Sequence, residues 1–135
     1  MLTSTDDSFT AHPMIGHIGI RVKDFDASFA FYEKTLAPLG YKPMFGEKGM
    51  YYGFGVDQPD FWISAASAEK PVSVGIHIAF SVATKELADA FHAAALAAGG
   101  TDNGAPGPRP EYGPTYYGAF ITDPDGNNIE AVCHT

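Results

Sequence analysis

An internal repeat limits what this chain can fold into more than any other feature of its sequence. When the sequence is shifted by sixty positions, residues 17–22 align with residues 77–82 without a gap. The same register continues through further identities: Ala30-Phe31 with Ala90-Phe91, Leu36-Ala37 with Leu96-Ala97, and Gly40 with Gly100. So many matches in one ungapped register indicate two copies of the same structural unit.

Each copy predicts a strand, a helix and three further strands. The first strand is a short run of β-branched and apolar residues, at 15–22 in one copy and 74–82 in the other. A helix follows, capped by Asp24 or Asp26 in the first copy and by Thr84 in the second, and both helices end at glycine. The remaining strands are expected at residues 41–45, 50–56, 61–65, 101–105, 115–121 and 128–133.

The buried faces of the helices and one irregular segment can also be predicted. One apolar stripe on each helix is expected to pack on a sheet, formed by Ala27, Ala30, Phe31 and Ala37 and by Leu87, Ala90, Phe91 and Ala97. Residues 103–114 contain four prolines and three glycines, so a loop beside the functional site is expected there. Residues 1–135 should form one domain, with a first module at 14–66 and a second at 73–134.

Size and composition exclude several classes of function. A chain of 135 residues with 45% hydrophobic residues can bury one core. Its net charge of -8, with no basic run, argues against nucleic acid or an anionic membrane as a partner. The first ten residues are polar and acidic and no apolar stretch could span a bilayer, so a cytoplasmic location is expected. Cys133 is the only cysteine, which rules out an internal disulfide and a thiolate zinc site.

Two histidines and a glutamate are the candidate metal ligands. His17 and His77 occupy the same place in the two copies, and packing of the copies is expected to bring them together. Glu130 lies in the strand that follows the tight turn at 123–126, where it can supply the third ligand. Two histidines and one carboxylate suit a divalent ion such as Zn, Ni, Mn, Co or Fe(II) and leave positions open for substrate.

Four segments carry a resemblance to a known family. The stretches at 16–24 (GHIGIRVKD), 31–33 (FYE), 75–82 (GIHIAFSV) and 123–130 (DPDGNNIE) resemble signature segments of the glyoxalase/bleomycin resistance/extradiol dioxygenase family, also called the vicinal oxygen chelate family. The likeness covers nearly all of residues 14–134. It implies an α+β fold of two tandem βαβββ modules, with a curved mixed sheet around a metal-binding cleft.

The resemblance implies a fold more strongly than a reaction, because the family includes lyases, transferases, dioxygenases and antibiotic-binding proteins without metal. The favoured hypothesis is a glyoxalase-like metal-dependent enzyme, in which the ion chelates vicinal oxygens of a small-molecule substrate. A non-catalytic protein that binds a small molecule or antibiotic is the alternative, and an extradiol-type dioxygenase is third. Because curved sheets leave edges exposed and family members usually dimerise, a homodimer is also expected.

Further residues are candidates for substrate binding and catalysis. Arg21 and His134 share side-chain parity with His17 and Glu130 along their strands, so they could bind a polar or anionic substrate. Trp62 aligns with Glu130 in the other copy, where an indole can be neither ligand nor base, which argues against the glyoxalase I reaction. The aromatic and cationic residues in and after the proline-rich segment are Arg109, Tyr112, Tyr116 and Tyr117.

Among these, Tyr116 is expected to bind substrate, and Tyr117 is expected to act with Glu130 in catalysis by donating a proton or hydrogen bond. Aromatic packing is the alternative for each tyrosine. His12 and His92 have no evident partner and are expected to be solvated.

Overall fold

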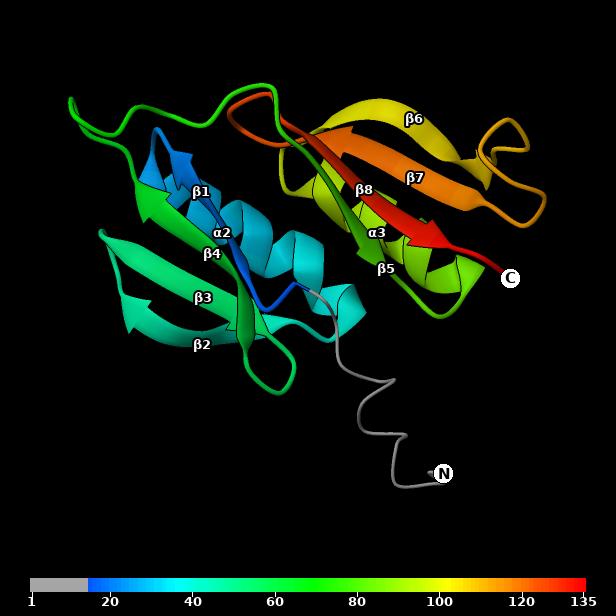
Figure 1. Ribbon diagram of the computed structural model, residues 1–135, viewed down its shortest axis with the longest axis horizontal. Coiled ribbons are helices and arrows are strands. Elements are labelled where there is room, and N and C mark those ends of the chain that lie inside the picture. The colour runs from blue at the N-terminus through cyan, green and yellow to red at the C-terminus, as the bar shows by residue number, and fades with distance from the viewer. Residues whose placement is uncertain (1–14) are drawn as a thin grey trace.

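The computed structural model describes residues 15–135, so His12 and the start of the first predicted module at Met14 lie outside the described residues. In each half of the chain one α-helix follows the first strand and precedes three more (Figure 1). In chain order the elements are β1 (Ile18–Val22), α2 (Phe25–Leu36), η2 (Ala37–Leu39), β2 (Lys42–Glu47), β3 (Tyr51–Gly55), β4 (Pro59–Ala65), β5 (His77–Ser81), α3 (Lys85–Ala97), β6 (Thr101–Pro108), β7 (Tyr117–Thr122) and β8 (Asn128–Cys133).

The strands form two four-stranded mixed sheets with the same topology. The first sheet has the order β1-β4-β3-β2 and the second has the order β5-β8-β7-β6. β1 runs parallel to β4 and β5 runs parallel to β8, whereas the other neighbours are antiparallel. The predicted α+β fold with tandem βαβββ modules is confirmed, although its strands form two sheets and not one continuous sheet.

Local sequence signals determine where the helices begin and end. The Asp24 carboxylate accepts a hydrogen bond from the Ala27 amide at 3.1 Å, and the Thr84 hydroxyl accepts one from the Leu87 amide at 3.2 Å. These caps pair amides that have no partner within the helix. Gly40 and Gly99 end the helical segments with φ angles of 84° and 102°, a backbone conformation that favours glycine.

The predicted apolar stripe was largely wrong for α2 and partly right for α3, where Phe91 is buried, Leu87 and Ala90 are partly buried and Ala97 is exposed. Ala27 and Ala30 of α2 and Ala37 at the start of η2 are exposed. The helix instead buries larger side chains, namely Phe25, Ser28, Phe29, Phe31, Tyr32, Thr35 and Leu36. The reason is that α2 contacts both the first sheet and α3, so it has two buried sides (Figure 1). α3 similarly buries Ala88, Phe91, His92 and Ala95.

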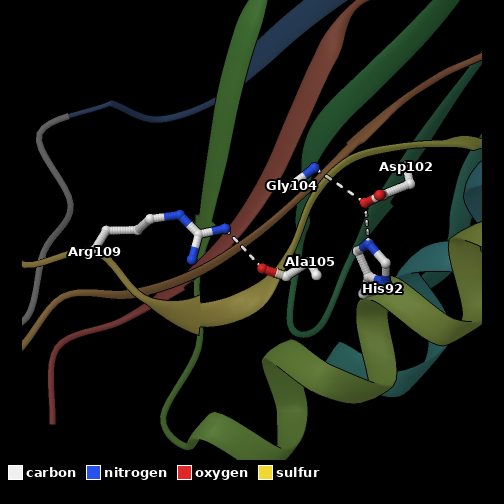
Figure 2. Close-up of polar contacts among 5 residues, drawn as sticks. All are labelled: His92, Asp102, Gly104, Ala105 and Arg109. Atoms are coloured by element: carbon white, nitrogen blue, oxygen red, sulfur yellow. Dashed lines mark hydrogen bonds and ion pairs between the residues drawn. The ribbon is translucent and has the colours of Figure 1, made fainter.

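His92 is buried and not solvated as expected, because it has an acidic partner. Its Nε2 atom lies 2.9 Å from Oδ1 of Asp102 on β6, and the same carboxylate oxygen accepts a hydrogen bond from the Gly104 amide (Figure 2). The Gly104 amide and the contact with His92 lower the pKa of Asp102 from its ordinary value. The contact between His92 and Asp102 therefore connects α3 to the edge strand β6.

The proline-rich segment is also more regular than expected. β6 continues through Pro106 to Pro108, beyond the predicted end of the strand at residue 105. Prolines are tolerated there because β6 is an edge strand, where one side of the backbone has no strand to bond. Its pairing with β7 shifts register around Gly104, as expected at a bulge.

Hydrogen bonds from α2 and from the residue before its cap connect the first module to the second across long stretches of sequence. The Tyr32 hydroxyl on α2 donates to Oδ2 of Asp123 at 2.5 Å, and the Lys23 amide donates to Oδ2 of Asp125 at 3.3 Å. Both acceptors lie in the turn between β7 and β8. The core between α2, α3 and the helix-facing sides of the two sheets is continuous. Within residues 15–135 no helix is long and apolar enough to cross a membrane.

Candidate metal site

Each sheet has one face that no helix covers, here called its open face. On β5 the side chains of His77, Ala79 and Ser81 are exposed on this face, whereas Phe80 is buried against the helices. Glu130 lies beside Ala79 in the parallel register of β5 and β8, one step diagonally from His77. The strand pairing therefore brings His77 and Glu130 together on the open face of the second sheet.

The two side chains are in direct contact. His77 Nε2 lies 2.8 Å from Glu130 Oε1, and the exposed fractions of the two side chains are 52% and 1%. A buried carboxylate is costly unless its oxygens are paired. The second oxygen of Glu130 is paired with the Tyr116 hydroxyl, which donates to Oε2. Burial and the hydrogen bond to Glu130 raise the pKa of Tyr116 to about 12, so the phenol stays protonated and remains a donor.

A cavity opens at this pair. Its volume is about 530 Å³, and its walls are formed by His77, Tyr112, Tyr116, Phe120, Asn128 and Glu130. Gly118 lies next to two of these residues: a Cβ atom added to it would come within 3.1 Å of Glu130 Oε2 and of the Tyr116 ring. A buried carboxylate beside an exposed imidazole at the wall of a cavity is an arrangement that could hold a divalent ion.

The structure does not bring His17 to this pair. His17 lies just before β1 in the other module and lines a separate cavity of about 240 Å³ with residues that include Tyr41 and Asp60. Among the residues that the structure describes, no three His, Cys, Asp or Glu side chains are close enough to hold one ion. The expected convergence of His17, His77 and Glu130 is therefore not present within a single copy of residues 15–135.

Trp62 occupies the position in the first sheet that Glu130 occupies in the second. Gly19 on β1 pairs with Trp62 on β4. Ala79, sixty positions after Gly19, pairs in the same way with Glu130 on β8. The indole lies on the open face, where its ring centroid is 6.3 Å from the rings of both Phe45 and Tyr51. The first sheet therefore presents an aromatic surface where the second presents a carboxylate.

The other predicted site residues lie at different distances from this centre. His134 is beside it, with its ring centroid 5.2 Å from that of Tyr116. Arg21 is exposed on the open face of the first sheet, in the same module as His17. The Tyr117 hydroxyl is turned toward α3 and donates to Asp89 at 2.6 Å, so Tyr117 does not meet Glu130.

Phe120 and Asn128 line the cavity but were not among the predicted site residues. Asn128 lies two residues before Glu130 on β8, and the antiparallel register places Phe120 opposite Glu130 on β7. The first signal was available in the sequence, because residues two apart on a strand share a face. The second needed the register of β7 against β8, which the sequence does not reveal.

Comparisons with known proteins agree with this fold. The family model of the Glyoxalase/Bleomycin resistance protein/Dioxygenase superfamily matches residues 14–131. No curated protein matches the chain at a significant level. Among solved structures, a glyoxalase/bleomycin resistance protein from Albidiferax ferrireducens is 31% identical with a TM-score of 0.77, and the match covers 91% of this chain and 100% of that one.

More distant structures share the fold. A glyoxalase/bleomycin resistance protein/dioxygenase family enzyme from Burkholderia phytofirmans is 24% identical, with a TM-score of 0.70 over 90% of this chain and 98% of that one. A mutant of the fosfomycin resistance protein FosX from Listeria monocytogenes, solved with Mn(II) and a dihydroxypropylphosphonic acid, is 18% identical, with a TM-score of 0.65 over 92% of each chain. The chain belongs to the glyoxalase/bleomycin resistance protein/dioxygenase superfamily.

Proposed function

We propose that this protein is a glyoxalase-like metal-dependent enzyme that acts on a small molecule with vicinal oxygens. The observation that carries the proposal is the His77–Glu130 pair, 2.8 Å apart at the wall of a cavity of about 530 Å³. The ion would be Zn, Ni, Mn, Co or Fe(II), all of which accept nitrogen and carboxylate ligands. A bound ion of this kind would polarise the substrate oxygens as a Lewis acid.

The residues around the pair have separate roles in this proposal. Tyr116 holds Oε2 of Glu130 and so orients the carboxylate, leaving Oε1 on the His77 side. Glu130 would serve as a ligand and as the group that exchanges a proton with the substrate. His134, beside Tyr116, is placed to contact bound substrate. Tyr117 is not given a catalytic role, because its hydroxyl is held by Asp89.

The third ligand would come from a second copy of the chain. His17 is exposed and lies on the other module from His77 and Glu130, so one copy supplies two ligands and a second copy can supply the third. The open face of the first sheet also carries exposed apolar side chains that a partner would cover, including Phe45 at 63% exposed. In such a homodimer, Arg21 and Trp62 of one copy would face the cavity of the other.

A binding protein without catalysis is the second candidate. The observation that favours it is the aromatic surface of Phe45, Tyr51 and Trp62, which could hold a flat organic molecule by stacking.

The metal content of the purified protein distinguishes the enzyme from the binding protein. Protein purified without chelator and reconstituted with each ion should contain close to one equivalent per chain if it is the enzyme. Less than about a tenth of an equivalent of any transition metal would contradict the enzyme.

Glu130→Gln tests the ligand assignment directly. This change keeps the size of the side chain but removes the charge that balances a divalent ion, so metal affinity should fall by about tenfold or more. Metal titration by calorimetry gives the affinity, and thermal melts without metal show whether the fold survives.

The matched control is Asp125→Asn in the neighbouring turn. Asp125 accepts a hydrogen bond from the Lys23 amide, and asparagine can still accept it, so metal affinity should be unchanged. If Asp125→Asn lost metal and Glu130→Gln kept it, the carboxylate ligand would have to be sought in the turn and not at Glu130.

A further inference from the structure

A second cavity continues from the one at His77 and Glu130. Its volume is about 220 Å³, and it shares Tyr112, Phe120 and Asn128 with the larger cavity. Its remaining walls are Asn103, Gly104 and Arg109. A small molecule held at His77 and Glu130 could therefore extend past Phe120 into this second space.

Arg109 brings a fixed positive charge to the second cavity. The guanidinium lies over the Phe120 ring, 5.3 Å from its centroid. It donates to the Ala105 carbonyl at 2.7 Å (Figure 2) and to the Pro108 carbonyl at 3.3 Å, so two of its five N–H donors are used and three remain. These contacts hold the side chain in one orientation without neutralising its charge.

No acidic side chain balances that charge in the part of the chain that the structure describes. The ion pairs there are His77 with Glu130 and His92 with Asp102. The protein has 16 acidic residues against 8 basic ones, so carboxylates are plentiful elsewhere on the surface. A guanidinium that faces a cavity and has no carboxylate partner is suited to bind an oxyanion from solution.

Asn128 supplies a second polar group with unused hydrogen-bonding capacity. It lines both cavities, and its Oδ1 atom is buried without a hydrogen-bond partner among residues 15–135. An amide oxygen can only accept a hydrogen bond, so Oδ1 is suited to a hydroxyl or N–H donor of a ligand and not to an anion. It stands between Glu130, two residues further along β8, and the space beside Arg109.

We infer that Arg109 forms an anion-binding subsite, next to Asn128, that selects substrates carrying a carboxylate, phosphonate or phosphate group beyond their vicinal oxygens. Arg109 binds the oxyanion through its free N–H groups, and Asn128 Oδ1 accepts a hydrogen bond from a hydroxyl of the same molecule, between the anion and Glu130. The substrate class rests on the proposed function, whereas binding of an anion at Arg109 does not.

Three diols that differ at one end test the subsite. Propanediol has no anion, dihydroxybutyrate ends in a carboxylate and glycerol phosphate ends in a phosphate. Calorimetric titration with and without Mn(II) should show that at least one of the two anions binds about tenfold or more tightly than propanediol. Arg109→Gln should abolish this preference. Lys85→Gln is the matched control, because Lys85 also lies over an aromatic ring, that of Tyr117, but outside both cavities.

The outcomes separate the subsite from the metal site. Glu130→Gln should remove any effect of Mn(II) on affinity but retain the preference for the anion. If Mn(II) has no effect on the wild type while the preference depends on Arg109, the proposed function fails and the subsite stands. Three outcomes would contradict the subsite: no preference of the wild type for the anion over propanediol, an equal loss of that preference in Lys85→Gln, or a lower melting temperature of Arg109→Gln with the preference unchanged. Arg109 would then only stabilise the connection between β6 and β7.

Discussion

Gly118 illustrates how a residue without a side chain shapes the site. Glu130 and Tyr116 meet directly above its backbone on β7, and both come within 3.1 Å of the position where a Cβ atom would lie. Few Cβ atoms in proteins have contacts this short, so any other residue would displace the carboxylate or the phenol. The absence of a side chain at this point is therefore part of how Glu130 is positioned.

Gly118→Ala should weaken metal binding and lower the free energy of unfolding by about 1 kcal/mol, since overpacking forces neighbouring side chains to shift. Metal titration and urea unfolding would measure the two effects. Gly19→Ala is the control, because its nearest side-chain contact would be an ordinary 3.6 Å to Trp62 and the equivalent residue in the repeat, Ala79, is already alanine. Equal losses in both variants would show that the contact with Glu130 is not the cause.

At the scale of single residues, the sequence predicted which side chains belong near the site better than which way they point. Tyr116 and Tyr117 are adjacent, and consecutive strand residues face opposite sides of a sheet. Tyr116 meets Glu130, whereas Tyr117 meets Asp89 on the helix side. Only the pairing of β7 with β8 distinguishes them, and this pairing is a long-range property of the fold. Trp62, in contrast, was placed correctly, because aligning the turn before the last strand of the first copy with the turn at 123–126 in the second, and allowing the first turn to be shorter, matches it with Glu130.

Among the elements, α2 depends on a buried hydrogen bond to the turn between β7 and β8. The Tyr32 side chain is fully buried, and its hydroxyl donates to Asp123, whose other oxygen accepts from the amides of Asp125 and Asn127 at 2.9 Å. The Asp123 carboxylate thus organises its own turn and holds a helix from the other module. Burial, together with the negative charge of Asp123, raises the pKa of Tyr32 well above its ordinary value.

Tyr32→Phe should lower the free energy of unfolding by about 1.5–3 kcal/mol, because it leaves a buried carboxylate oxygen without its donor. Urea unfolding at neutral pH would measure the loss. Tyr41→Phe provides the comparison, since the Tyr41 hydroxyl also donates to a carboxylate, that of Asp60, but is only partly buried. A loss in Tyr41→Phe as large as that in Tyr32→Phe would contradict the importance given to burial.

The same substitution has a pH signature. Because the pKa of Tyr32 is higher in the folded protein than its ordinary value of 10.0, its contribution to stability is complete below pH 10 and is lost as the pH rises further. The wild type should therefore lose stability above pH 10 more steeply than Tyr32→Phe. Parallel curves for the two proteins would mean that Tyr32 does not titrate differently on unfolding.

Elements were predicted well at their ends and poorly on their faces. Asp24 and Thr84 cap the helices through contacts within four residues, so the sequence reveals them directly. The buried side of α2 depends on α3, which begins 49 residues after α2 ends. An amphipathic pattern drawn for a helix against one sheet could not anticipate a second helix on its flank.

For the whole molecule, the separation of the two open faces decides how a complete site can form. His17, just before β1, and Trp62 on β4 lie in the first module, His77 and Glu130 lie in the second sheet, and α2 and α3 pack against each other between them. The repeat predicted the two modules because similar sequences fold alike. It did not predict that the matched histidines stay apart within one chain, because their distance depends on how the helices pack together.

Mixing two inactive variants tests the shared site. His17→Ala and His77→Ala should each fail to bind metal as homodimers. In a mixed dimer, one site receives intact His17 from one chain and intact His77 and Glu130 from the other. After subunit exchange, roughly a quarter of the wild-type metal capacity should return.

A site built within one chain would show no recovery on mixing. Light scattering gives an independent check, because the dimer should have about twice the 14.4 kDa mass of the chain. A mass near 14.4 kDa at all concentrations would contradict the shared site.

The connection between Tyr32 and Asp123 also bears on how the protein is made. The two residues are 91 positions apart, and the acceptor of the Lys23 amide, Asp125, is synthesised 102 positions later. A ribosome adds about 5–20 residues each second, so the first module emerges several seconds before the turn that completes it. During that interval the nascent first module lacks the acceptor for its buried hydroxyl and the neighbouring helix that covers α2. We expect the two modules to acquire their final structure together, late in translation.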